Sequence, residues 1–160
     1  MKPPAAALAL LCLVTPIQAP AESDYLRLEF RDAPAQFQPV PGRAGMTRFS
    51  MLDAISLEGQ AGAARLVVKF ALPPDAAPDA QPLDARVTYR PHGYVDYWQT
   101  AELPAPGAFI FEQVQLSGPR PRVTGRFEVT LCARASVMDM HDSGNCSVAR
   151  GRFASDLQID

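Results

Sequence analysis

Two segments near the carboxyl end decide the fold: residues 123–132 read VTGRFEVTLC, and residues 146–159 read CSVARGRFASDLQI. Apolar or small residues alternate with polar ones along the first segment, and the same alternation runs from Ala149 to Ile159 in the second. A period of two is typical of strands with one buried face. The sequence therefore predicts an antiparallel hairpin made of these two strands.

The two cysteines set the register of this hairpin. If Cys132 and Cys146 lie opposite each other, the tripeptide Gly-Arg-Phe at 125–127 meets its second copy at 151–153. Phe127 is then opposite Gly151, and Phe153 is opposite Gly125. An aromatic ring that covers a glycine on the partner strand restores strand stability, so this register is self-consistent.

The same register predicts which charges become neighbours. Arg126 is opposite Arg152, which is a repulsive pair, while Glu128 is opposite Arg150. We expect Arg126 and Arg152 to lie on the outer face of the sheet with acidic residues nearby. Arg120 and Arg122 add to the positive charge around this hairpin.

The amino terminus has the features of a secretory signal peptide. Met1-Lys2 is followed by an apolar run from Ala5 to Val14, and Ala19-Pro20-Ala21 supplies small residues for cleavage. The run is well short of the ~20 residues that cross a bilayer, so we expect no membrane span after cleavage. The sequence predicts a signal peptide over 1–21, cut before Glu22 or alternatively after Ala19, one domain over 22–160, and a periplasmic or extracellular location.

Composition is that of an ordinary globular domain. The chain has 160 residues, of which 48% are hydrophobic and 20% charged, which excludes a disordered polyelectrolyte. The net charge of -2 argues against a nucleic-acid partner. Loss of the signal removes one of 3 cysteines. The even remainder in an exported chain predicts a disulfide between Cys132 and Cys146, with free thiols or metal ligands as alternatives.

The rest of the chain reads as short strands separated by turns. Alternating or β-rich stretches predict strands over 25–31, 51–58, 64–72, 84–90, 94–100 and 108–116, with a short helix as the alternative for 51–58. The proline- and glycine-rich stretch 32–47 predicts a long connection, and 73–82 an exposed loop. We expect an all-β fold, an antiparallel β-sandwich or partly open barrel of about 7–9 short strands.

One predicted hairpin concentrates aromatic residues around Pro91-His92-Gly93. Alternation puts Tyr94 and Trp98 on one face and Val95 and Tyr97 on the other. Either these rings fill the core, or one face is open and contacts a sugar or a protein. The candidate binding residues at this hairpin are Tyr89, Arg90, His92, Tyr94, Tyr97 and Trp98.

A second candidate lies between the cysteines, where Met138, Met140 and His141 could bind copper, because thioethers select Cu(I) and imidazole accepts copper in either state. The competing interpretation is a loop tip whose methionines cover the end of the fold.

The recognisable enzyme motifs are missing: there is no Gly-x-Ser-x-Gly elbow, no phosphate-binding Walker loop and no His-Glu-x-x-His. Carboxylates from different strands could still form a hydrolase site. The sequence favours an exported, non-enzymatic domain without a cofactor that binds a partner protein or a small ligand, and the alternative is a periplasmic copper-binding protein.

Overall fold

The computed structural model describes residues 23–93, 96–101, 103–135 and 144–159. Within these ranges the chain forms strands and turns and no helix, so the described part has no helix that could cross a membrane. The strands are β1 (Tyr25–Phe30), β2 (Ala33–Pro39), β3 (Gly45–Arg48), β4 (Asp53–Ala61), β5 (Ala64–Leu72), β6 (Asp84–Arg90), β7 (Tyr97–Thr100), β8 (Phe109–Gln115), β9 (Arg122–Arg134), β10 (Cys146–Asp156) and β11 (Gln158–Ile159).

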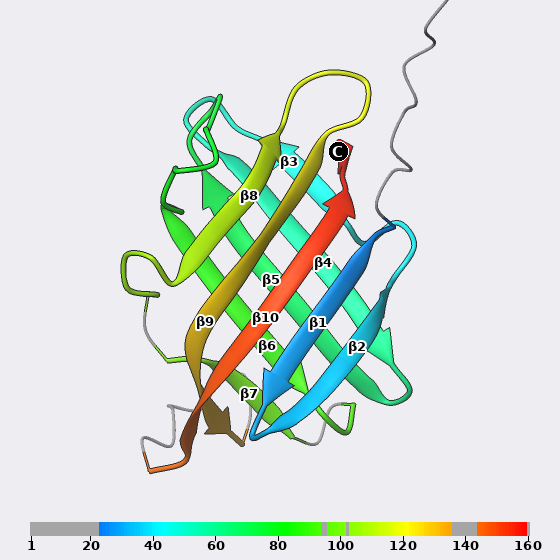
Figure 1. Ribbon diagram of the computed structural model, residues 1–160, viewed down its shortest axis with the longest axis vertical. Helices are drawn as coiled ribbons and strands as arrows, with labels where there is room; N and C mark the ends of the chain where they lie inside the picture. The colour runs from blue at the N-terminus through cyan, green and yellow to red at the C-terminus, as the bar shows by residue number, and fades with distance from the viewer. Residues whose placement is uncertain (1–22, 94–95, 102, 136–143, 160) are drawn as a thin grey trace, which may run out of the picture.

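Eight of these strands close into a barrel in the order β4-β2-β1-β10-β9-β7-β6-β5, with β5 pairing back to β4. All of these pairings are antiparallel. Three strands are added outside the ring: β3 pairs with β4, β11 runs parallel to β3, and β8 pairs with β9. The barrel is flattened into two layers whose strands cross steeply (Figure 1), with β8, β9, β10, β1 and β2 in one and β3 to β6 in the other. The predicted all-β fold is confirmed.

The C-terminal hairpin has the register that the sequence predicts. Cys146 pairs with Cys132, and the two are joined by a disulfide with an S–S distance of 2.01 Å. Phe127 is opposite Gly151, and Phe153 is opposite Gly125. Both rings are buried and point into the barrel.

The prediction of a long connection over 32–47 is wrong, because β2 lies within it and β3 begins in it. Arg31 and Asp32 both have positive φ, 52° and 60°, and form a two-residue turn that returns the chain directly as β2. Proline is tolerated in β2 because residues 33–37 have ladder partners only on the β1 side, and β4 pairs only with Gln38 and Pro39.

The eight strands of the barrel agree with the expected number of about 7–9. The described residues form eleven strands in all, because β3, β8 and β11 are added outside the ring. Residues 53–61 form a strand, so the helical alternative for that region is wrong.

The core lies between the two layers. Rings from three strands meet in it: Phe70 on β5 lies within 6.1 Å, centroid to centroid, of Phe109 and Phe111 on β8 and of Phe153 on β10. Inward positions alternate with exposed ones along β1 and β9, as the burial pattern of each strand shows. The outward positions of the layer that contains β1, β9 and β10 are therefore left for the solvent-facing surface.

Candidate functional site

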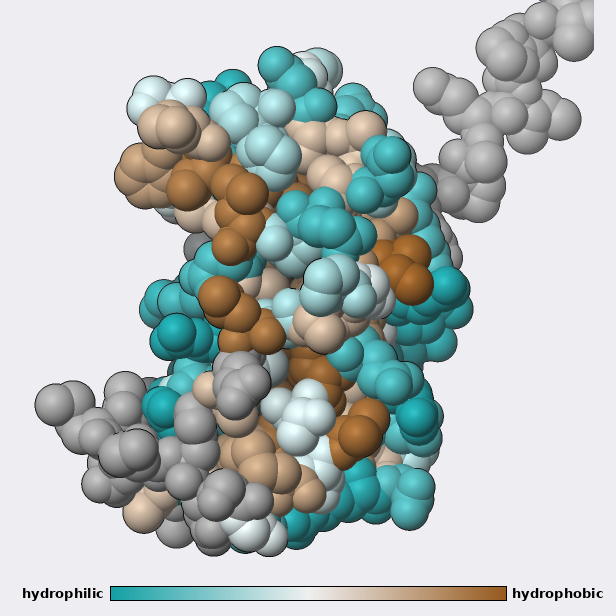
Figure 2. Space-filling model, turned by 90° about the vertical axis from the view of Figure 1, so that its left-hand side faces the viewer, coloured by the Kyte–Doolittle hydropathy of each residue, from teal (hydrophilic) through white to brown (hydrophobic). Residues whose placement is uncertain are grey.

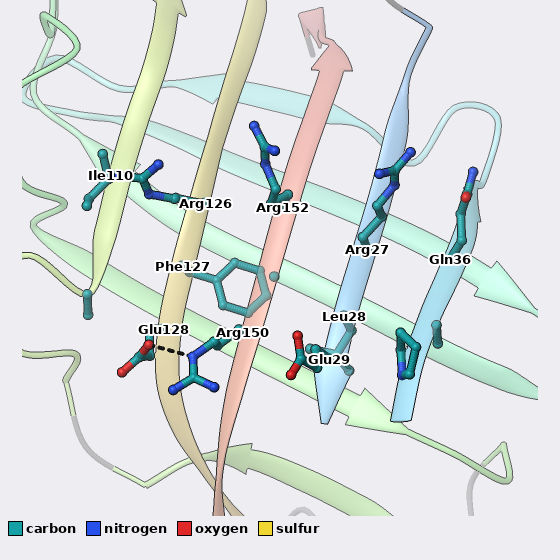
Figure 3. A pocket seen from close by; sticks show the side chains of 14 residues that line it. Arg27, Leu28, Glu29, Gln36, Ile110, Arg126, Phe127, Glu128, Arg150 and Arg152 are labelled. Carbon is teal, nitrogen blue, oxygen red and sulfur yellow. Dashed lines mark hydrogen bonds and ion pairs between the residues drawn. The ribbon is translucent and has the colours of Figure 1, made fainter. Parts of the chain in front are cut away.

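Three arginines stand side by side on the outer face of the β1–β10–β9 layer. Arg27 is in register with Arg152, and Arg152 with Arg126, so the row crosses three neighbouring strands. Strands in a sheet are about 4.8 Å apart, which makes these direct neighbours. Gln36 on β2 and Ile110 on β8 extend the row at its two ends. Figure 3 shows the arginine side chains following one another across the strands.

A second row lies two residues away from the first on each strand and carries mixed charge. Glu29, Arg150 and Glu128 are consecutive in register, so opposite charges alternate. Arg150 Nε donates a hydrogen bond of 2.8 Å to Glu128 Oε2 (Figure 3). This hydrogen bond and the charge of Glu128 raise the pKa of Arg150 above its ordinary value. The second row is thus close to internally balanced, unlike the first.

A groove of about 740 Å³ lies between the two rows. Leu28, Ala35, Gly151 and Phe127 line its floor and are themselves consecutive in register. Leu28 and Phe127 are only 2% and 3% exposed because their side chains point into the barrel, so the floor is the outer side of the backbone at these positions. Pro34 on β2 and Ile110 on β8 are exposed apolar side chains in the lining. The groove therefore has one cationic wall, one wall of mixed charge and a floor of paired strands.

A β-bulge on β8 supplies the carboxylate nearest to the arginine row. The register between β8 and β9 shifts between Phe111 and Gln113, so Glu112 has no partner in the ladder. A bulge redirects a side chain, and here both oxygens of Glu112 accept hydrogen bonds from Arg152 Nη2, at 3.2 and 3.4 Å. Arg126 Nη1 is 3.9 Å from the same carboxylate. The predicted acidic neighbour of Arg126 and Arg152 is therefore present, and one carboxylate serves both.

Arg27 has a different environment from the other two members of the row. Its guanidinium carbon lies 5.1 Å from the centroid of the Tyr25 ring. In the part of the chain that the structure describes, no carboxylate lies within 4.0 Å of the Arg27 guanidinium nitrogens. The row thus carries three positive charges against one negative charge. Like charges at directly opposite positions destabilise a sheet, so this arrangement has a folding cost.

The aromatic hairpin is largely buried. Tyr97 and Trp98 are 9% and 8% exposed, and Tyr89 is half-buried. Arg90 stacks on the Tyr97 ring, 5.0 Å from its centroid, and His92 is exposed. Tyr94 lies outside the described residues. An open aromatic face is not seen at the described rings, and the binding role of this hairpin stays a prediction.

Trp98 closes one end of the barrel with an arginine stacked on it. The guanidinium carbon of Arg31 is 4.2 Å from the Trp98 centroid, and Arg31 Nη2 donates a 2.7 Å hydrogen bond to Asn145 Oδ1. Trp98 also packs edge-on against Phe30 at 5.0 Å. These contacts show that Trp98 is packed against Arg31 and Phe30.

The predicted copper ligands Met138, Met140 and His141 lie outside the described residues, so this hypothesis stays a prediction. Within the described ranges, no group of three or more His, Cys, Asp or Glu side chains is arranged to hold a metal ion.

Exposed hydrophobic side chains are scattered over the surface. Figure 2 views the side of the barrel next to β8, where hydrophobic atoms form several patches separated by polar ones. Leu83, Leu103 and Ile110 are among the exposed large hydrophobic residues. Isolated hydrophobic residues are normal on a protein surface, so these patches define no binding face by themselves.

Part of this site could be predicted from the sequence. The hairpin register predicts that Arg126 is opposite Arg152, but it predicts neither the position of Arg27 beside them nor the groove. They depend on the pairing of β1 with β10, which joins segments more than a hundred residues apart. The alternation in 25–31 placed Arg27 on an outer face, and the only missing signal was which strand lies beside it.

No family model matches this chain, and neither a curated protein nor a solved structure is similar to it at a significant level.

Proposed function

We propose that this protein is an exported, non-enzymatic binding domain whose groove between the arginine row and the Glu29–Arg150–Glu128 row receives a partner protein or a small ligand. The observation that carries the proposal is the arginine row itself. Arg27, Arg152 and Arg126 are direct neighbours, and among the described residues the one carboxylate paired with the row is Glu112, which contacts Arg152 and Arg126 but not Arg27. An anionic group on a partner would remove the repulsion among them.

Export rests on the amino-terminal signal pattern and on the disulfide. Residues 1–21 have the cationic start, apolar run and small-residue end of a signal peptide. The Cys132–Cys146 bond supports the same conclusion, because disulfides persist in oxidising compartments.

The groove has the composition of a binding surface. Arginine is enriched in protein interfaces, and the lining also includes the exposed apolar residues Pro34 and Ile110. The side chains of Arg126 and Arg152 are 56% and 55% exposed and can reorient toward a partner.

The experiment incubates the exported fraction of the source cells with the mature protein and with two folded variants. It compares the molecules that each of the three proteins retains. The double variant R27Q/R152Q removes two charges of the row and keeps both side chains polar and able to donate hydrogen bonds. The control R86Q changes an exposed arginine on β6, in the opposite layer. We expect a protein or small molecule to be retained by the wild type and R86Q and lost with R27Q/R152Q. Identical retention by all three proteins would refute the groove as the binding site.

A further inference from the structure

We infer that the groove binds an acidic, extended segment of a partner polypeptide, and that Glu112 is a built-in competitor that occupies the arginine row until the segment displaces it. This inference rests on the proposed function, because it names the ligand class of the same groove.

Glu112 shows which chemistry the arginine row accepts. Its carboxylate is bonded by Arg152 and lies near Arg126, so a carboxylate already fits against this pair of guanidinium groups. Charge-assisted bonds between arginine and carboxylate are among the stronger hydrogen bonds in proteins. A carboxylate from a partner can therefore take the same position.

The contacts of Glu112 with Arg152 and Arg126 are weak enough for another carboxylate to displace it. Both of its short contacts come from one nitrogen of Arg152 rather than from a two-nitrogen fork, and the contact to Arg126 is 3.9 Å long. The Glu112 side chain is 37% exposed. Exposed ion pairs of this kind contribute little stability, so exchange for a better-placed carboxylate costs little.

Arg27 favours a ligand with more than one acidic group. It stands next to Arg152 on the side away from Glu112 and has no carboxylate near it in the described part of the chain. A ligand with one carboxylate would bind Arg152 and Arg126 and would give Arg27 no anionic partner. A segment with two or three acidic residues can engage the whole row.

The exposed apolar side chains of the groove and the small size of the cationic row favour a peptide over other polyanions. Pro34 and Ile110 line the groove and are exposed, so they can contact an apolar side chain of the segment. Glu29 and Glu128 flank the groove on its far side and would repel a uniformly negative surface such as a membrane or a nucleic-acid backbone. Among the described lining residues the one aromatic ring, Phe127, is only 3% exposed, so a sugar would find no aromatic face to stack on.

The test measures, by fluorescence anisotropy, the affinity of the mature protein for a labelled ten-residue peptide that contains glutamate, leucine and serine. A matched peptide with glutamine at each glutamate position is the ligand control. We expect the glutamate peptide to bind and the glutamine peptide to bind at least about tenfold more weakly, because the charge-assisted bonds are lost. R152Q should lower the affinity for the glutamate peptide by a similar factor.

The decisive variant is E112Q. Removal of the competing carboxylate should tighten binding of the glutamate peptide several-fold, and E112A should do the same. E58Q, which changes a carboxylate on β4 in the other layer, should leave the affinity unchanged. Peptide binding that is unchanged or weaker in both Glu112 variants would refute the competitor role.

Two further probes separate this inference from the proposed function. Polygalacturonate and vesicles that contain phosphatidylglycerol present anionic groups without a peptide. Suppose that either probe binds, that R27Q/R152Q abolishes this binding, and that the glutamate peptide does not bind. The groove is then a binding site, but the inference that it binds an acidic peptide segment is wrong. If no probe binds, yet the wild type retains a cellular component through Arg27 and Arg152, the acidic-segment inference alone fails.

Discussion

Phe127 on β9 lies directly opposite Gly151 on β10, and its ring fills the space that a Cβ on Gly151 would need. The same ring stacks on Phe109, with centroids 5.6 Å apart. This contact is part of the hairpin register and continues the aromatic core on the inner face of the sheet, behind the floor of the groove.

The substitution G151A is expected to destabilise the fold by about 1–3 kcal/mol, which is typical of overpacking in a close-packed core. A new methyl group would overlap the Phe127 ring and lie 2.8 Å from the backbone oxygen of Arg27. Urea unfolding measures the loss. In an F127L background the cost of G151A should fall, because the smaller side chain can yield. Equal costs in both backgrounds would contradict the contact.

Removal of the disulfide in the variant C132S/C146S should lower the free energy of unfolding by ~3 kcal/mol, the chain-entropy value for a closed loop of about 15 residues. The bond joins directly opposed positions on β9 and β10. The measurement is urea unfolding with and without reductant. Reductant should destabilise the wild type and leave the variant unaffected, whereas an equal response of both proteins would count against the bond.

The ion pair between Arg48 and Asp53 stabilises the junction of β3 and β4. Asp53 is 3% exposed, and its Oδ1 lies 3.2 Å from Arg48 Nε. The variant R48M leaves a buried carboxylate without this partner and should cost about 1–3 kcal/mol. R48M/D53N should be more stable than R48M alone, because it removes the charge as well. A double variant that is less stable than R48M would contradict this account.

Alkaline pH should weaken the fold partly through Tyr89. Burial raises the pKa of Tyr89 above the ordinary value of 10.0. The unfolded chain then loses this proton at lower pH than the folded chain does. The stabilising contribution of Tyr89 is complete below pH 10 and declines as pH rises from there through the raised pKa. Unfolding measured from pH 8 upward should show a steeper loss of stability in the wild type than in Y89F. Parallel curves would exclude the effect.

The sequence predicted those parts of the structure that depend on local pattern and missed those that depend on distant pairing. Cys132 and Cys146, together with the two Gly-Arg-Phe tripeptides, were enough to define one hairpin to the residue. Pro34 and Pro39 concealed β2, because a proline-tolerant strand with one-sided pairing has the same composition as a loop.

The same distinction between local pattern and distant pairing applies to the candidate site. Arg126 and Arg152 could be placed together from the hairpin alone, whereas the position of Arg27 beside them required the β1–β10 register. The aromatic hairpin was the more conspicuous candidate in the sequence. Trp98 is instead packed beneath Arg31, and ring clusters of this kind cannot be assigned to core or surface until their neighbours are known.

The most direct test of the binding groove is an NMR titration of the isotope-labelled mature protein with the glutamate peptide. If the peptide binds in the groove, the largest changes in backbone amide shifts fall on the outer face of β1, β9 and β10, centred on Arg27, Arg126 and Gly151. We expect these changes to vanish in R27Q/R152Q. Changes centred on the outer face of β4, β5 and β6, or changes that persist in R27Q/R152Q, would contradict binding in the groove.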